Sequence, residues 1–133
     1  MVHLDMLYWN EDKTVVEKTV FLERLQQALQ MPGWIIDGNF SSTMEWRMQE
    51  CDTVFFLDYP VELCLQGVRQ RMGTQRSDIP WVETEEDPEF IQFIKDFNRQ
   101  RRPQIMELLK KNGDKNIVVF KDRTEADAFL HDL

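Results

Sequence analysis

Residues 53–58 read TVFFLD, a continuous apolar run that ends on an acid, and residues 34–37 read WIID, a second run of the same kind. A short, wholly apolar run is typical of a strand buried on both faces, as in a parallel sheet. An Asp at the carboxyl end of such a strand points toward the crevice where open α/β sheets bind ligands. The two runs therefore predict parallel strands, with Asp37 and Asp58 at a ligand-binding edge of the sheet.

Strand-like and helix-like segments alternate along the rest of the chain. Further strands are predicted at residues 2–7 and 116–120. A capping box formed by Thr14 and Glu17 predicts the start of a first helix, which ends at residues 31–33. A short helix begins at Ser42, and the next helix runs from Pro60 to about residue 72, with Asp58 as a candidate cap. The left-handed position that ends that helix is assigned to Gly73.

The C-terminal third of the chain is predicted to be mainly helical. A long helix starts at residues 87–88 and is broken near Arg102 by Pro103, so that its second part covers residues 105–111. A last helix over residues 125–132 is capped by Thr124. Residues 74–87 show no period and hold a proline and several acids, which indicates a loop or lid.

This order of elements predicts one α/β domain over residues 1–133, in which the lid of about residues 74–87 is an insertion. Because strands alternate with helices, the sheet should be parallel, with helices on both faces, which gives a three-layer architecture.

Composition limits the function classes. The net charge of −8 gives no support to a general nucleic-acid binder. No apolar stretch approaches the roughly 20 residues that a membrane span needs, and the N-terminus has no signal-peptide pattern. We therefore expect a cytoplasmic protein with no membrane partner.

Arginines cluster downstream of the two acidic strand ends. Guanidinium groups bind phosphate in bidentate fashion, and the lids of nucleotide kinases use arginines to neutralise the transferring phosphoryl group. The alternative is a solvated face on which these arginines pair with nearby acids such as Glu83 and Glu86. The residues predicted to bind phosphate are Arg69, Arg71, Arg76, Arg99 and Arg102.

Five sequence blocks occur in this order along the chain: "VHLDMLYW", "WIIDGNF", "DTVFFLDYP", the arginines of "RQRMGTQRSD" and "FNRQRRP", and "VVFKDRTEADAFL". In these blocks and in their order, the chain resembles the adenylate-kinase-like P-loop proteins known as DNA topology modulation proteins. The resemblance extends over essentially the whole chain. It implies a P-loop NTPase fold and a kinase, that is, an ATP-binding, nucleotide-binding transferase with Mg²⁺ and ATP as cofactors.

The same resemblance implies roles for individual residues. Asp37 would hold Mg²⁺ through water, and Asp5 would orient or deprotonate the hydroxyl of an acceptor. Trp9 and Asn39 are assigned to substrate binding, because an indole can stack on an acceptor ring. The alternatives are that Asp5 and Asp37 cap turns and that Trp9 is an ordinary core aromatic.

One part of the family pattern is missing. Members carry a strand and a G-x-x-x-x-G-K-[ST] loop before the "HLD" strand, and no such Walker A motif occurs in this sequence. The chain is interpreted as a fragment. A degenerate, non-catalytic protein and a protein that recovers the missing part from another chain are the alternatives.

The predicted function is therefore that of a kinase-type domain acting on a nucleotide or another small hydroxylated acceptor, inactive when alone. A non-catalytic module that binds nucleotide or a partner, and a regulator linked to DNA topology, are the alternatives. Because the missing strand is central in the family's sheet, its absence would leave strand edges unpaired. A rearranged sheet or a homodimer that shares elements is expected to compensate.

Overall fold

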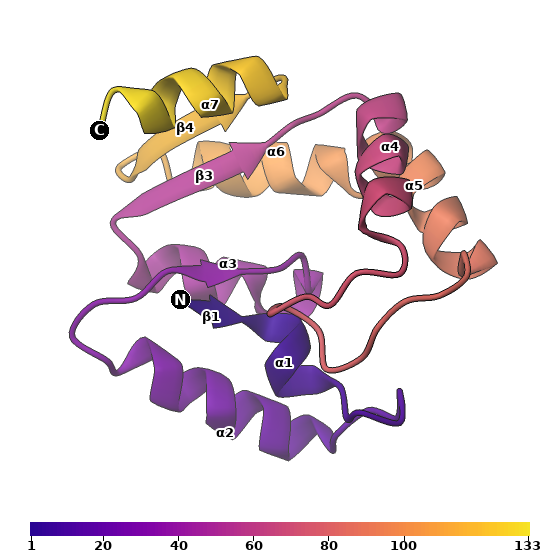
Figure 1. The fold of residues 1–133 in the computed structure, drawn as a ribbon. Helices are drawn as coiled ribbons and strands as arrows, with labels where there is room; N and C mark the ends of the chain where they lie inside the picture. Colours follow the sequence, from indigo (N-terminus) through magenta and orange to yellow (C-terminus); the bar gives the residue numbers. More distant parts are fainter. The chain divides into compact units, whose positions relative to one another are not determined.

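The computed structural model describes residues 1–133 and is mixed α/β, with seven helices and four short strands. The residues form two compact units (Figure 1). Unit 1 comprises Met1–Glu50 and Gly73–Thr84, and unit 2 comprises Cys51–Met72 and Glu85–Leu133. Whether the two units act as the single domain predicted from the sequence stays a prediction. None of the helices combines the length and the apolar composition that a membrane crossing requires.

Unit 1 is built on one parallel pair of two-residue strands. β1 pairs with β2 so that Val2 lies opposite Ile36 and His3 lies opposite Asp37. The parallel direction predicted for these strands is confirmed, although each is shorter than expected. The elements of this unit are β1 (Val2–His3), α1 (Leu4–Tyr8), α2 (Lys18–Leu29), β2 (Ile36–Asp37) and α3 (Ser41–Glu50).

The core of unit 1 explains why the first predicted strand is wrong beyond His3. Leu4 is fully buried together with Phe21 and Leu25, and Leu7 and Tyr8 pack against this cluster. Positions 4, 7 and 8 share one face only in a helix, and α1 packs that face against α2. The burial of these side chains therefore turns the chain into a helix where a strand over residues 2–7 was predicted.

The predicted capping box before α2 is also wrong. Thr14 lies in a turn in which its backbone N–H donates to the carboxylate of Asp12, and Lys13 has a positive φ of 68°. An isolated antiparallel bridge between Trp9 and Val15 closes this turn. The helix starts only at Lys18. Glu17 is its N-cap residue but makes no capping hydrogen bond with its side chain, and Thr14 belongs to the preceding turn.

Residues 74–84 contain no helix or strand, as predicted for the lid, but they are packed within unit 1. Ile79 is only 7% exposed, and the backbone N–H of Gly73 donates to the carbonyl of Glu83. Gly73 has a φ of +75°, which confirms its predicted left-handed position after the preceding helix.

Unit 2 holds the second parallel pair, β3 and β4, in a five-residue register from Thr53 opposite Asn116 to Leu57 opposite Phe120. Both strands match their predicted positions to within one residue. In Figure 1, α7 turns back from the end of β4 and lies along it. The elements are β3 (Thr53–Leu57), α4 (Val61–Arg71), α5 (Pro88–Gln100), α6 (Arg102–Lys111), β4 (Asn116–Phe120) and α7 (Arg123–His131).

The helices of unit 2 follow the predicted boundaries closely. Asp87 caps α5 by accepting a hydrogen bond from the N–H of Glu89, and the predicted break falls at Arg101, one residue before α6. Leu65 and Val68 of α4 are buried against Ile94 of α5. The two predicted caps in this unit are wrong. Asp58 does not cap α4, and Asp122, not Thr124, caps α7 by accepting from the N–H of Glu125.

The four strands form two separate parallel pairs, β1 with β2 and β3 with β4. A parallel sheet with the expected strand direction is therefore present in each unit, and every one of the four strands lies at a sheet edge.

Candidate functional site

At the carboxyl end of the β1–β2 pair, a histidine and a carboxylate meet. His3 ends β1 and Asp37 ends β2, and His3 Nδ1 lies 2.9 Å from Asp37 Oδ1. The side chain of Asp37 is 52% exposed, whereas that of His3 is 20% exposed. Because the two residues are opposite each other in the parallel register, the strand pairing itself brings them together.

Asp5 lies in the first turn of α1, next to this pair, and not at the end of a strand as predicted. Burial raises the pKa of its carboxyl group, and the nearby carboxylates of Asp78 and Asp37 add to this effect. A hydrogen bond from the Trp9 side chain and the charge of Arg76 oppose it. The ionised form of Asp5 is therefore disfavoured, which makes it a better proton acceptor than an ordinary surface aspartate.

Arg76 brings a positive charge from the loop to this acidic group. Its Nε and Nη2 donate to the two carboxylate oxygens of Asp78 at 2.9 and 2.6 Å, and its Nη1 lies 3.7 Å from Glu83. The Arg76 side chain is 17% exposed, and the hydrogen bonds that it donates to Asp78 raise the pKa of Arg76. This geometry holds the guanidinium against carboxylates within unit 1.

The loop that follows Asp37 is shaped by Arg47, which sequence reasoning did not single out. The Arg47 guanidinium donates to the carbonyls of Gly38, Asn39 and Phe40 at 3.1, 2.7 and 3.1 Å. Burial lowers the pKa of Arg47 to about 10. These bonds fix the backbone directly after Asp37 and leave the Asn39 side chain, predicted to bind substrate, on the exposed side of the loop.

Aromatic side chains border the acidic group. The ring centroid of Trp9 lies 5.6 Å from that of Trp81 at an interplanar angle of 90°, and 5.1 Å from that of Tyr8. The ammonium of Lys13 lies 5.7 Å from the Trp81 ring centroid, within cation–π range. Trp9 was predicted from the sequence. Trp81 was missed, because nothing in the loop's composition indicates which residue returns to α1.

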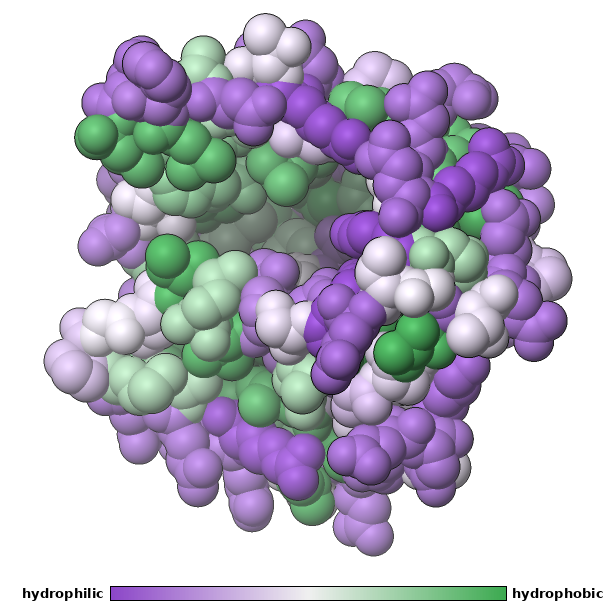
Figure 2. Space-filling model, in the orientation of Figure 1, coloured by the Kyte–Doolittle hydropathy of each residue, from purple (hydrophilic) through white to green (hydrophobic).

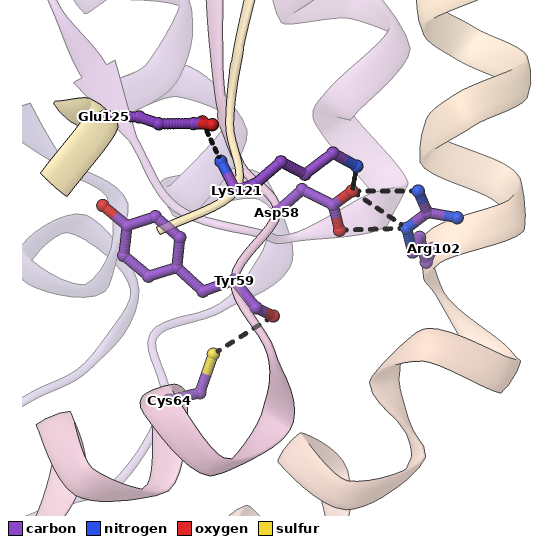
Figure 3. A network of polar contacts seen from close by, with 6 residues as sticks. All are labelled: Asp58, Tyr59, Cys64, Arg102, Lys121 and Glu125. Carbon is purple, nitrogen blue, oxygen red and sulfur yellow. Dashed lines mark hydrogen bonds and ion pairs between the residues drawn. The ribbon is translucent and has the colours of Figure 1, made fainter. Parts of the chain in front are cut away.

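A second charged cluster stands at the carboxyl end of the β3–β4 pair in unit 2 (Figure 3). Arg102 Nε and Nη2 donate to Asp58 Oδ1 and Oδ2, both at 2.9 Å, and Lys121 Nζ donates to Oδ2 at 2.6 Å. The Asp58 side chain is 7% exposed. Hydrogen bonds from Arg102, followed by that from Lys121, lower the pKa of Asp58 to about 2.

Most of the predicted phosphate-binding arginines make ion pairs in the structure. Arg102 binds Asp58, Arg69 lies 3.0 Å from Glu86, and Arg99 lies 3.3 Å from Asp96. The pairs of Arg76 with Glu83 and of Arg69 with Glu86 match the alternative stated for the sequence. Arg71 is exposed near the end of α4. Phosphate binding by these residues stays a prediction.

The structure thus gathers Asp5, Asp37, Trp9 and Arg76 in unit 1, and it adds His3 and Trp81 to them. Arg69, Arg71, Arg99 and Arg102 belong to unit 2. No group of three or more His, Cys, Asp and Glu side chains is placed to hold a metal ion. A comparison of the chain with protein-family models, curated proteins and solved structures finds no match.

Proposed function

We propose that this chain is an adenylate-kinase-like P-loop protein of the DNA topology modulation type, a phosphotransferase-type domain with a three-layer parallel α/β fold. The main support for this proposal is that five side chains lie near one another at the carboxyl end of the β1–β2 pair: Asp5, Asp37, His3, Arg76 and Trp9. Open α/β proteins bind ligands at this end of their strands.

The strand pairing supports the same proposal. The strand before the P-loop lies at the centre of the family's sheet. The two strand pairs of this chain, β1 with β2 and β3 with β4, are each parallel, as the strands of that sheet are.

Within the proposal, unit 1 binds the acceptor. Asp5 accepts the proton of an acceptor hydroxyl, since its raised pKa brings it closer to neutral pH. Trp9 lies beside this carboxylate and contacts a ring of the acceptor, while the exposed Asn39 supplies hydrogen bonds. A nucleotide, or another small molecule that combines hydroxyl groups with a ring, suits this set of side chains.

The donor set at Asp37 fits a hydrated Mg²⁺. Mg²⁺ commonly keeps several waters and uses one or two protein carboxylates together with the phosphates of its substrate. Asp37 is half exposed and engages His3 through a single carboxylate oxygen. Asp37 would hold Mg²⁺ through water, and ATP would be the source of the phosphoryl group, while Asp5 and Trp9 position the acceptor.

A non-catalytic binding module is the second candidate. The observation that favours it is the pairing of arginines with carboxylates, above all Arg102 with Asp58 and Arg76 with Asp78. An arginine held in this way would have to leave its partner before it could neutralise a transferring phosphoryl group.

Tryptophan fluorescence tests the proposal, since Trp9 and Trp81 lie at the site. A panel of nucleosides and nucleoside monophosphates is titrated into the wild-type protein and into the Asp5→Asn variant. We expect one member to change the emission saturably and to bind the variant at least about tenfold more weakly, as for loss of one charged hydrogen-bond partner. Asp132→Asn, at an exposed position near the C-terminus, is the matched control. Absence of binding by every member would refute the acceptor site.

A further inference from the structure

β3 is an edge strand whose only strand partner is β4. Its hydrogen-bonding partner is β4 alone, so the N–H and C=O groups on its other edge have no strand beside them. Residues 53–57 carry no charge, proline or glycine, the devices by which proteins usually protect such an edge.

The side chains of β3 are also unusually exposed for a strand of this composition. Phe55 is 50% exposed and Leu57 is 56% exposed, although both are large and apolar. In Figure 2, green hydrophobic atoms are visible on the surface where β3 and α7 lie. Because residues 55 and 57 point to the same face of the strand, they form one continuous apolar strip next to the open edge.

We propose that β3 pairs with β3 of a second copy of this chain. A two-fold axis makes two identical strands antiparallel, which creates a four-stranded sheet in the order β4-β3-β3-β4. A two-stranded sheet is marginal on its own, and further strands on an apolar face add to its stability. This inference does not depend on the proposed function.

The sequence of β3 is self-complementary when the axis passes through Phe55. Thr53 then lies opposite Leu57, and Val54 lies opposite Phe56, so apolar side chains meet across the new ladder. No charged side chain is buried by this pairing, because the strand contains none between residues 53 and 57.

Charges at the two ends of the strand complement each other in the same register. Asp52, exposed before β3, lies opposite Asp58 of the second copy. Asp58 forms ion pairs with both Arg102 and Lys121, so the charges of these three side chains sum to about +1. The Lys121 side chain is 57% exposed. The carboxylate of Asp52 thus faces a positive cluster at each end of the interface, which favours a second copy over an unrelated strand.

Sedimentation velocity over a series of protein concentrations tests the pairing. We expect the wild type to form dimers and Leu57→Lys to raise the dimer dissociation constant by about tenfold or more, because a lysine on the edge blocks strand pairing. Leu130→Lys places the same charge on a residue of α7 that is 63% exposed and should leave the dimer unchanged. A wild type that stays monomeric, or a dimer indifferent to Leu57→Lys, overturns the proposal.

Exchanging the charges at positions 52 and 121 tests the proposed register of the β3–β3 pairing without introducing a charge into the apolar strand. Asp52→Lys alone and Lys121→Glu alone should each weaken the dimer, because each puts like charges opposite each other at both ends. An equal mixture of the two variants restores opposite charges at both ends, and heterodimers should form at concentrations where each variant alone is monomeric. Failure of the mixture to dimerise, or undiminished dimerisation of the single variants, would exclude this register.

Discussion

Asp58 is a nearly buried carboxylate that is held by two cations, and its pKa of about 2 lies below the ordinary 3.8. Between these two values the unfolded chain binds more protons than the folded chain, so protonation favours unfolding. We expect the wild type to lose stability as the pH falls from about 4 toward about 2. In Asp58→Asn this part of the pH dependence should be absent. Urea denaturation at several pH values measures the difference.

The ion pair of the nearly buried Asp58 should contribute more to the free energy of unfolding than an exposed ion pair does, and replacing one arginine of each pair tests this. Arg102→Met leaves the nearly buried Asp58 with Lys121 alone of its two cations, and it should lower the free energy of unfolding at pH 7 by clearly more than loss of an exposed pair does. Arg99→Met is the matched control, because that side chain is 77% exposed and its pair with Asp96 should be worth less than about 0.5 kcal/mol. Equal effects of the two substitutions would contradict the structural role given to Asp58.

Gly38, directly after Asp37, shows how a single backbone position shapes the site. Its φ is +138°, and a Cβ there would lie 2.9 Å from Leu4 Cβ, in the fully buried core of unit 1. Gly38→Ala should therefore cost about 2 kcal/mol or more of unfolding free energy. Gly33→Ala, where a Cβ meets nothing within 4 Å, is the matched control and should be nearly neutral. Thermal and urea denaturation of the two variants decide the point.

At the scale of elements, α7 offers a test of which residue caps a helix. Asp122 accepts a hydrogen bond from the N–H of Glu125 at 2.9 Å, whereas the sequence favoured Thr124 as the cap. We expect Asp122→Ala to lower the unfolding free energy by about 1 kcal/mol. Thr124→Ala, already inside the helix, should change it by no more than a few tenths. A larger loss for Thr124→Ala would restore the prediction made from the sequence.

Elements whose signal is local could be predicted from the sequence, and elements that depend on distant contacts could not. The strands β3 and β4 and the start of α5 follow from apolar runs and from Asp87-Pro88, and they lie within one residue of the predicted positions. The helix α1 was missed because only its burial against Phe21 and Leu25 separates it from a strand.

The candidate site shows the same division. Asp37 is apparent at the end of an apolar run, but its partner His3 is 34 residues away in sequence. Trp81 contacts Trp9, and the charge of Arg76 acts on Asp5, both from a loop without any periodic pattern. Arg47 binds backbone carbonyls, which leave no trace in residue type. Contacts of this kind are set by the fold and cannot be read from local spacing.

At the scale of the whole molecule, the sequence lacks the Gly-rich loop that cradles the phosphates of ATP. Backbone N–H groups at a helix N-terminus provide much of the affinity for phosphate. We therefore expect calorimetry of the chain with ATP and Mg²⁺ to show weak binding or none. Tight binding would mean that another part of this chain replaces the cradle, and it would contradict this prediction.

We propose that an acceptor binds in unit 1 at the carboxyl end of β1 and β2. An amide ¹H–¹⁵N NMR titration with the nucleoside or nucleoside monophosphate that gives the largest fluorescence change locates the bound molecule. We expect the largest chemical-shift changes to cluster at residues 3–9, 36–40 and 76–83. Shifts confined to the cluster around Asp58, or scattered over both units, would contradict it.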